Sequence, residues 1–329
     1  MKKDVFQKIK KELFGIQKNV PLAKYTTFRI GGLAKYFFVA KNKEEIISAI
    51  LVAKKLKLSF FILGGGSNIL VSDRGFKGLV IKVESRILKV EGSNIYAGAG
   101  VSLNESVSTA LENNLTGFEW GVGIPGTVGG AIYGNAGAFG KSIADVVKSV
   151  EVLDVKNLET KKLKNKNCKF GYRDSVFKRD RNLILLSAII QLKKGKKSEI
   201  KRKIKEFLDY RQETQPLNFP SAGSVFKNVK FANLHKFTSN ITNKKIREIC
   251  GKFGDIRKIP AGWLIERCNL KGKKIGKAKI SEKHANFIVN LGGAKAKDVK
   301  ELIKLIKQKV KIKFGIVLEE EIQHLGFKN

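Results

Sequence analysis

The chain has 329 residues, of which 43% are hydrophobic and 29% charged, and this composition excludes a protein that is mainly disordered. Its formal net charge of +36 favours anionic ligands such as nucleotides and diphosphates. No signature of a nucleic-acid-binding module accompanies the charge, and no apolar run approaches the ~18 residues of a membrane-spanning helix. We therefore expect a cytoplasmic protein of two or three domains that binds neither nucleic acid nor membrane.

The first half of the chain has the pattern of alternating strands and helices. Strands are expected at residues 36–40, 59–63, 78–83, 87–90 and 94–97. Apolar residues at helical spacing predict a helix between the first two strands. Ser102 and Glu105 have the spacing of a capping box, which predicts the start of a second helix. The glycine content of residues 117–140 predicts a stretch without regular structure.

The second half continues with a mixed pattern. Strands are expected at residues 147–155, 183–192, 224–226, 286–290 and 317–323. Apolar stripes predict helices at 200–208, 246–253 and 299–310. The last strand would place Glu319 and Glu321 on the same side. This order of elements predicts an α+β fold.

Two segments rich in glycine are candidates for binding a diphosphate. They are Gly64-Gly65-Gly66-Ser67-Asn68 and residues 123–140, where Thr127 and Asn135 add polar side chains. A backbone without Cβ atoms can approach a pyrophosphate closely and direct several N–H groups at its oxygens. Each loop alone could equally be a tight turn between strands. Two such loops in one domain favour a large diphosphate cofactor.

Two other patterns are expected to carry no chemistry. Residues 121–126 match G-x-G-x-x-G, but the flanking sequence has neither the strand nor the uninterrupted helix of a Rossmann fingerprint. The cysteines and histidines are widely spaced, at Cys168, Cys250, Cys268, His235, His284 and His324. Their spacing predicts packing residues, with no metal site and no disulfide framework.

Seven motifs occur in order along the chain. They are YTTFRIGG at 25–32, LGGGSNIL at 63–70, GIPGTVGG at 123–130, NAGAFG at 135–140, FGYRDSVFK at 170–178, PSAGSVFKN at 220–228 and AGWLIE at 261–266. Together they resemble the UDP-N-acetylenolpyruvoylglucosamine reductase family, from about residue 20 to the C-terminus. The glycine loops alone are shared with FAD-linked oxidases of the vanillyl-alcohol-oxidase type. FGYRDS followed by GSxFKN is far more specific.

The resemblance implies a fold and a division into domains. It implies an FAD-binding module of the vanillyl-alcohol-oxidase/PCMH type with two subdomains, followed by a C-terminal α+β substrate-binding domain. The subdomains are expected at 1–84 and 85–195, and the C-terminal domain at 196–329. The strand at 315–329 is a candidate for returning to the first subdomain.

The resemblance also implies an activity. NADPH would deliver a hydride to non-covalent FAD, and UDP-N-acetylglucosamine enolpyruvate would then be reduced to UDP-N-acetylmuramate in peptidoglycan precursor synthesis. Neither glycine loop contains a histidine or cysteine that could link the flavin covalently. A monomer is expected. The alternative is an FAD-linked oxidase acting on a hydroxy acid or alditol, which would be reoxidised by oxygen and would not need NADPH.

Catalytic roles follow from the family's positions. Arg173 would stabilise negative charge on the substrate carboxylate, Ser224 would be the general acid, and Glu321 would orient or protonate the same carbon. Without the resemblance, Arg173 could form a surface ion pair with Asp174. Residues 319–321 would be a solvated run of glutamates, and Ser224 would belong to a turn.

Binding roles are implied in the same way. The expected cofactor residues are Thr27, Gly64, Gly65, Gly66, Ser67, Asn68, Gly123, Ile124, Pro125, Gly126, Thr127, Gly129, Gly130 and Asn135. The expected substrate residues are Tyr172, Arg211, Lys227, Asn228 and His284. Arg211 could equally lie at a solvated helix end. The chain departs from the family in having Thr214 where a lysine is frequent, and no tyrosine-bearing insertion follows residues 183–192.

Overall fold

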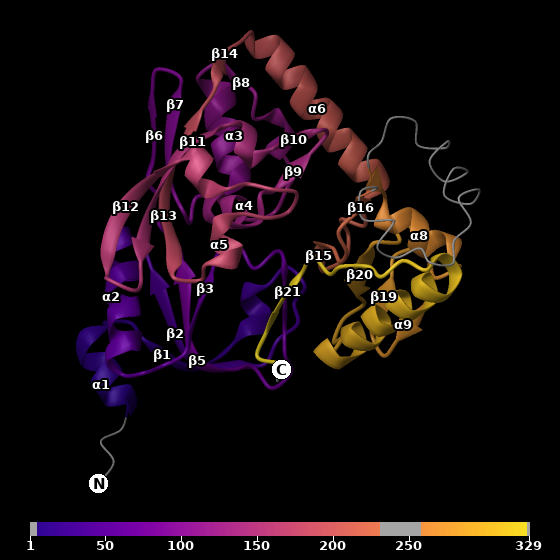
Figure 1. The fold of residues 1–329 in the computed structure, drawn as a ribbon, viewed down its shortest axis with the longest axis horizontal. Coiled ribbons are helices and arrows are strands. Elements are labelled where there is room, and N and C mark those ends of the chain that lie inside the picture. Colours follow the sequence, from indigo (N-terminus) through magenta and orange to yellow (C-terminus); the bar gives the residue numbers. More distant parts are fainter. Residues whose placement is uncertain (1–4, 231–257, 328–329) are drawn as a thin grey trace. The chain divides into compact units, whose positions relative to one another are not determined.

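The computed structural model describes residues 5–230 and 258–327, and Figure 1 labels its elements. These residues form two compact units, each with a hydrophobic core of its own. The first unit comprises the described parts of Met1–Val20, Ala34–Gly65 and Phe76–Glu213, and the second those of Pro21–Leu33, Gly66–Gly75 and Thr214–Asn329. Within the described ranges, no helix is both long and apolar enough to cross a membrane.

The two units divide the chain differently from the three expected domains. The helix α6 (Lys197–Thr214) lies almost wholly in the first unit, although the sequence places the start of the third domain at residue 196. Residues 1–84 do not stay together, because Pro21–Leu33 and Gly66–Gly75 belong to the second unit. Near the C-terminus, β21 (Gln323–Leu325) pairs in parallel with β4 (Ile69–Val71), so this strand does return to an early part of the chain.

The first unit contains a sheet in the order β1–β2–β5–β3. Its strands are β1 (Gln17–Pro21), β2 (Leu33–Ala40), β3 (Phe60–Leu63) and β5 (Phe76–Val83). Both β2 and β3 pair in parallel with β5. The helix α2 (Lys43–Lys55) connects β2 to β3. Its N-cap is Asn42, whose Oδ1 accepts the Glu45 N–H at 2.8 Å. The predicted strand–helix–strand unit is confirmed, and Gly64 follows directly where β3 ends.

A second sheet of this unit is antiparallel, in the order β12–β11–β13–β7–β6. Its strands are β6 (Leu88–Glu91), β7 (Asn94–Gly98), β11 (Val147–Asp154), β12 (Glu159–Lys164) and β13 (Leu183–Gln191). The predicted helix between β7 and β11 in sequence is α3 (Leu103–Glu112), and Ser102 Oγ accepts the Glu105 N–H at its start at 3.0 Å. Apolar side chains of the sheet and of α3 belong to one core.

The expectation that residues 117–140 lack regular structure is wrong. The helix α4 (Val128–Gly134) forms inside this stretch, because Thr127 caps it and Val128, Ala131 and Ile132 are buried on one face. Burial of that face outweighs the low helix propensity of its glycines. The G-x-G-x-x-G match is preceded by the short 3-10 helix η2 (Glu119–Gly121) and not by a strand, so the sequence argument against a Rossmann fingerprint is confirmed.

Shorter elements complete the first unit. They are α1 (Val5–Glu12), β8 (Leu115–Thr116), β9 (Gly137–Ala138), β10 (Lys141–Ser142), η3 (Ile143–Asp145), η4 (Asn165–Cys168), α5 (Val176–Arg179) and β14 (Lys193–Lys194).

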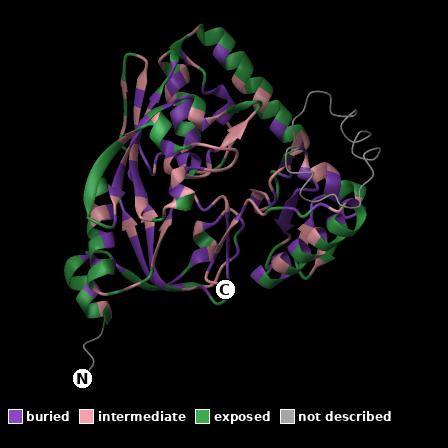
Figure 2. Ribbon diagram, viewed as in Figure 1, coloured by how far each residue is buried: buried purple, intermediate pink, exposed green. Residues whose placement is uncertain are grey.

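The second unit is built on a sheet in the order β15–β20–β19–β18. Its described elements are η1 (Leu22–Tyr25), β4, β15 (Ser221–Ser224), β16 (Val229–Lys230), β17 (Lys258–Ile259), α8 (Ala261–Arg267), β18 (Lys274–Ile275), β19 (Ala278–Ile280), β20 (Phe287–Asn290), α9 (Ala296–Phe314) and β21. One side of α9 is buried, and it carries the predicted apolar stripe (Figure 2). The helix predicted at 246–253 lies outside the described residues, as do Cys250 and His235.

The closing strand differs from its predicted extent of 317–323. Only Gln323–Leu325 pairs as a strand, while Glu320 makes an isolated antiparallel bridge to Phe226. Among the described residues just before Glu320, the Glu319 oxygen accepts the Lys227 N–H, but no continuous strand forms.

Candidate functional site

The two glycine loops meet inside the first unit. A Cβ on Gly65 would lie 2.7 Å from the Gly126 Cα, and one on Gly64 would lie 2.7 Å from Thr127 Oγ1. Both distances are shorter than side chains tolerate, so these positions require glycine. The loop after β3 and the loop before α4 therefore pack backbone against backbone.

The second unit holds the continuation of the first glycine loop. Gly66 has φ +64°, and a Cβ there would lie 2.0 Å from the Tyr25 carbonyl oxygen. The Thr27 N–H donates to the Gly66 oxygen at 3.1 Å, and the Thr27 hydroxyl donates to the Ser221 oxygen at 2.7 Å. Asn68 Nδ2 donates to the Glu321 oxygen at 3.3 Å. Thr27 and Asn68 thus shape this loop through bonds to backbone.

The polar residues of the second glycine loop also hold backbone. Thr127 Oγ1 accepts the Gly130 N–H at 3.2 Å, and Gly129 packs on Ala99 so closely that a Cβ would lie 2.9 Å from the Ala99 Cβ. Asn135 ends α4 in the left-handed conformation, with φ 45°. Its Nδ2 donates to the Gly171 oxygen at 2.6 Å, and its Oδ1 accepts the Ala144 N–H at 3.2 Å.

Arg211 of α6 is buried against the start of this loop. A Cβ on Gly123, which has φ +69°, would lie 2.9 Å from the Arg211 Cδ. The guanidinium donates to the Trp120 oxygen at 3.3 Å and lies 5.3 Å from the centre of the Phe139 ring. Burial lowers the pKa of Arg211, partly offset by Tyr210. The alternative of a solvated helix end is therefore wrong.

These loops fit a bound diphosphate. Within the described part of the chain, the N–H groups of Gly65 and Thr127 donate to no protein acceptor. Gly64, Gly65, Gly126 and Thr127 are each at most partly exposed. Backbone N–H groups that lack protein acceptors are suited to phosphate oxygens. Ile124 is half-buried against the core of this unit, whereas Pro125 is exposed.

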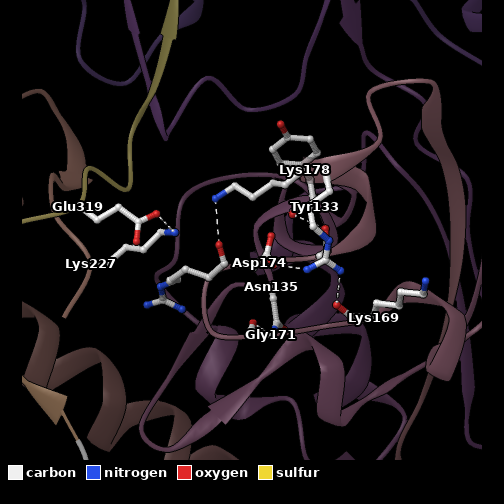
Figure 3. Close-up of polar contacts among 11 residues, drawn as sticks. Tyr133, Asn135, Lys169, Gly171, Asp174, Lys178, Lys227 and Glu319 are labelled. Carbon is white, nitrogen blue, oxygen red and sulfur yellow. Dashed lines mark hydrogen bonds and ion pairs between the residues drawn. The ribbon is translucent and has the colours of Figure 1, made fainter. Parts of the chain in front are cut away.

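Arg173 lies in a tight turn between Gly171 and Asp174, two residues that Figure 3 labels. The backbones of Gly171 and Asp174 exchange two hydrogen bonds, at 2.9 and 3.2 Å, and Arg173 between them has φ 52°. A left-handed conformation is strained for a residue with a Cβ, and such strain often occurs at functional sites. The Arg173 guanidinium donates to the Gly137 oxygen at 2.9 Å and lies 5.7 Å from the Tyr172 ring.

The neighbours of Arg173 add to a cationic turn. Lys178 Nζ donates to the Arg173 oxygen at 3.0 Å, and the carboxylate of Asp174 forms an ion pair with Arg179 (Figure 3). The guanidinium of Arg179 also donates to the Lys169 oxygen at 2.9 Å.

Ser224 and Glu321 lie on neighbouring segments of the second unit. Ser224 ends β15 and pairs with Phe287 of β20. In the next residues, the Glu321 N–H donates to the Val225 oxygen at 2.8 Å, and the Lys227 N–H donates to the Glu319 oxygen at 2.9 Å. The structure therefore brings together two of the three expected catalytic residues, whereas Arg173 belongs to the other unit.

Three expected substrate residues lie in the same unit as Ser224. Lys227 forms an ion pair with Glu319 (Figure 3), and Asn228 Oδ1 accepts the Ala261 N–H at the start of α8 at 3.1 Å. His284 is largely enclosed, and its Nδ1 accepts the Asn286 N–H at 3.2 Å. Burial lowers the pKa of His284, so the ring is neutral at pH 7.

Asn286 is a residue of this site that sequence reasoning missed. Its Oδ1 accepts the Phe226 N–H at 3.0 Å, its Nδ2 donates to the Phe226 oxygen at 2.8 Å, and its own oxygen accepts the Val225 N–H. The side chain is buried, and it fixes the backbone directly after Ser224. A lone asparagine before a strand gives no signal of this role in the sequence.

The comparisons with known proteins settle the family. Residues 215–325 match the C-terminal domain of UDP-N-acetylenolpyruvoylglucosamine reductase, and residues 34–161 match an FAD binding domain. The UDP-N-acetylenolpyruvoylglucosamine reductase of Caldanaerobacter subterraneus subsp. tengcongensis is 43% identical over 94% of this chain and 93% of its own length. The chain belongs to the UDP-N-acetylenolpyruvoylglucosamine reductase family.

Further relatives agree with this assignment. UDP-N-acetylenolpyruvoylglucosamine reductase 1 of Bacillus cereus is 39% identical over 94% of each chain. The crystal structure of the reductase from Thermus caldophilus superimposes with a TM-score of 0.74 at 31% identity, covering 94% of this chain and 99% of that one. The expected α+β fold, with an FAD-binding module and a separate C-terminal domain, is confirmed. As a member of the family, the protein is an FAD-dependent oxidoreductase.

Proposed function

We propose that the chain catalyses the NADPH-dependent reduction of UDP-N-acetylglucosamine enolpyruvate to UDP-N-acetylmuramate, a step of peptidoglycan precursor synthesis. The proposal is carried by the pairing of the segment after Ser224 with the segment of Glu321 inside one unit. Reduction of the enolpyruvyl group adds a hydride and a proton across a carbon–carbon double bond. The enzyme therefore needs a proton donor and an orienting group close to each other.

Non-covalent FAD would supply the hydride, which it receives from NADPH, and the loops at Gly64–Asn68 and Gly123–Asn135 would hold its diphosphate. Support comes from the backbone packing of Gly65 on Gly126 and from the open N–H groups beside it. Thr27 and Asn135 would act by shaping the loops, because their side chains bond to backbone.

Arg173 would bind and polarise the substrate carboxylate. Negative charge develops there as the hydride adds to the double bond, and a planar guanidinium can engage both carboxylate oxygens. Its bond to the Gly137 oxygen and its left-handed backbone hold the group in one orientation before substrate arrives. Preorganisation of this kind lowers the barrier because no reorganisation is needed during the reaction.

Ser224 would donate the proton to the carbon adjacent to the site of hydride addition. A hydroxyl is a weak acid, but the enolate formed in this reaction is strongly basic, so the transfer is favourable. Glu321 would orient or protonate the same carbon. Tyr172, Lys227, Asn228 and His284 would contact the substrate, with His284 serving as a neutral hydrogen-bonding group. Arg211 would act on the diphosphate.

The test is a pair of half-reactions under anaerobic conditions. The purified protein should show flavin absorbance that NADPH removes and that UDP-N-acetylglucosamine enolpyruvate restores. The product should be heavier than the substrate by one hydride and one proton. If oxygen restores the absorbance and the enolpyruvyl substrate does not, the protein is instead an FAD-linked oxidase.

A further inference from the structure

The segment that carries Glu321, residues 319–323, makes backbone hydrogen bonds to two other segments. Toward the residues after Ser224, Glu321 bonds to Val225 and Glu319 bonds to Lys227, as described above. Toward the glycine loop, the Gln323 N–H donates to the Asn68 oxygen at 3.0 Å. The segment therefore links the backbone next to Ser224 with a loop expected to bind the cofactor, all within the second unit.

Glu320, between two residues of that segment, has a set of partners of its own. Its Oε2 lies 2.6 Å from His324 Nε2, and its Oε1 forms an ion pair with Lys307. The side chains are 18% exposed for Glu320, 25% for His324 and 36% for Lys307. The three residues thus form a largely shielded cluster, in contrast to a solvated run of glutamates.

The carboxylate of Glu320 is ionised under all ordinary conditions. Burial by itself raises the pKa of Glu320, but hydrogen bonds from His324 and Lys307, together with their charges, lower it to about 2. Charge-assisted hydrogen bonds are shorter and stronger than neutral ones, and removal of one partner of a shielded pair leaves the other charge uncompensated.

Both partners of Glu320 belong to elements fixed by the core. Lys307 is on α9, whose buried face includes Ile303, Ile306 and Val310. His324 is in β21, where it pairs with Leu70 of β4. Glu320 therefore ties the segment of Glu321 to a long helix on one side and to a parallel strand pair on the other.

We propose that Lys307, Glu320 and His324 form a positioning cluster that fixes the backbone at Glu321 and so sets the place from which the Glu321 carboxylate acts. The inference rests on the proposed function, in which Glu321 orients or protonates the substrate carbon. The three side chains would act through the backbone at Glu321 and not by contact with the substrate. Misplacement of a catalytic group by about 1 Å can lower a rate by about 10²-fold, so the cluster matters for turnover.

Glu320→Gln is the central test, because the amide keeps the shape of the side chain but loses its charge. The restoration of flavin absorbance by the enolpyruvyl substrate should slow by about 10- to 10²-fold at saturating substrate, with KM little changed. The removal of flavin absorbance by NADPH should keep the wild-type rate. Lys307→Met should reproduce the defect, and Lys307→Arg, which retains a cation that donates hydrogen bonds, should largely rescue it.

Amide hydrogen exchange of residues 319–323 tests the positioning without any substrate. Exchange should be at least about tenfold faster in Glu320→Gln than in wild type, while α9 exchanges as before. Lys309→Met, which removes an exposed lysine from α9, is the matched control and should match wild type in every assay. If amide exchange is unchanged in Glu320→Gln, or if both half-reactions slow equally, the cluster does not position Glu321. If the wild-type enzyme does not reduce the enolpyruvyl substrate, the proposed function is wrong. The exchange experiment would then still show whether the cluster fixes the backbone of residues 319–323.

Discussion

The backbone N–H of Glu321 donates a 2.8 Å hydrogen bond to the carbonyl oxygen of Val225, the residue that follows Ser224. Through this bond, the two residues proposed to handle the proton lie on adjacent extended segments of one unit. The bond joins backbone atoms, so side-chain substitutions at Ser224 leave it in place. Chemistry at the hydroxyl can therefore be separated from the folding of the segment.

Ser224→Ala should separate the two half-reactions. Removal of flavin absorbance by NADPH needs no proton at the substrate carbon, so its rate should remain that of wild type. Restoration by the enolpyruvyl substrate should slow by about 10²- to 10⁴-fold, the range of a lost general acid. Anaerobic stopped-flow at the flavin band measures both rates in one preparation.

Ser224→Cys is the companion variant, since a thiol is acidic and similarly placed. It should recover part of the activity that Ser224→Ala loses. If Ser224→Ala instead slows both half-reactions equally, the hydroxyl supports the fold of the site. If it slows neither, the proton comes from another group, and Glu321 is the next candidate.

Arg173→Lys should lower enolpyruvyl reduction by about 10²- to 10³-fold. Lysine keeps the positive charge but lacks the planar fork that engages two carboxylate oxygens, and it cannot reproduce the bond to the Gly137 oxygen in the same geometry. Steady-state rates over a range of substrate concentrations measure the loss.

Arg179→Lys is the matched control for Arg173→Lys, because the Arg179 side chain is 50% exposed and pairs with Asp174 in the same turn. Its activity should stay close to wild type. Wild-type turnover in Arg173→Lys would show that Arg173 serves the turn and not the substrate.

Periodicity predicted the long elements of this fold correctly. The stripe from Val299 to Val310 is the buried face of α9, and the apolar strand expected at 183–192 is β13 (Leu183–Gln191). Both signals are local, since each depends on the spacing of apolar residues along one element. The expected catalytic roles of Ser224 and Glu321 came from the resemblance to the family, which needs no knowledge of contacts.

Contacts between distant residues could not be predicted in this way. The stripe on α6 places Leu208 inside, yet Leu208 is 42% exposed while Arg211 is 7% exposed. Arg211 can be buried because its guanidinium donates a hydrogen bond to the Trp120 oxygen and lies over the Phe139 ring. Neither partner can be inferred from the sequence of the helix itself. The ion pair between Lys307 and Glu320 could not be predicted either, because the two residues belong to different elements.

Gly65→Ala should weaken the binding of FAD. The added Cβ would lie 2.7 Å from the Gly126 Cα, a backbone atom that cannot move without separating the two loops. Titration of the flavin-free protein with FAD should show a dissociation constant raised by about tenfold or more, since each 1.4 kcal/mol of lost binding energy is a factor of ten.

Gly134→Ala is the matched control for Gly65→Ala, because nothing lies within 4 Å of a Cβ at the end of α4. It should bind FAD as wild type does. FAD affinity that is unchanged in Gly65→Ala would show that the packing of the two loops does not shape the cofactor site.

The contribution of Glu320 to stability should depend on pH in a defined direction. Its pKa is about 2 in the folded protein and lies near the ordinary value of 4.5 in the unfolded chain, so the stabilising effect is fully present above about pH 4.5 and is lost as the pH falls toward 2. The shift corresponds to on the order of 3 kcal/mol, and more than half of it should be gone by about pH 3. The measurement is the difference in unfolding free energy between wild type and Glu320→Gln, from urea titrations between about pH 7 and pH 3. Other carboxylates titrate in both proteins and cancel in the difference. A difference that stays constant over this range would show that Lys307 and His324 do not hold the Glu320 carboxylate in its ionised form.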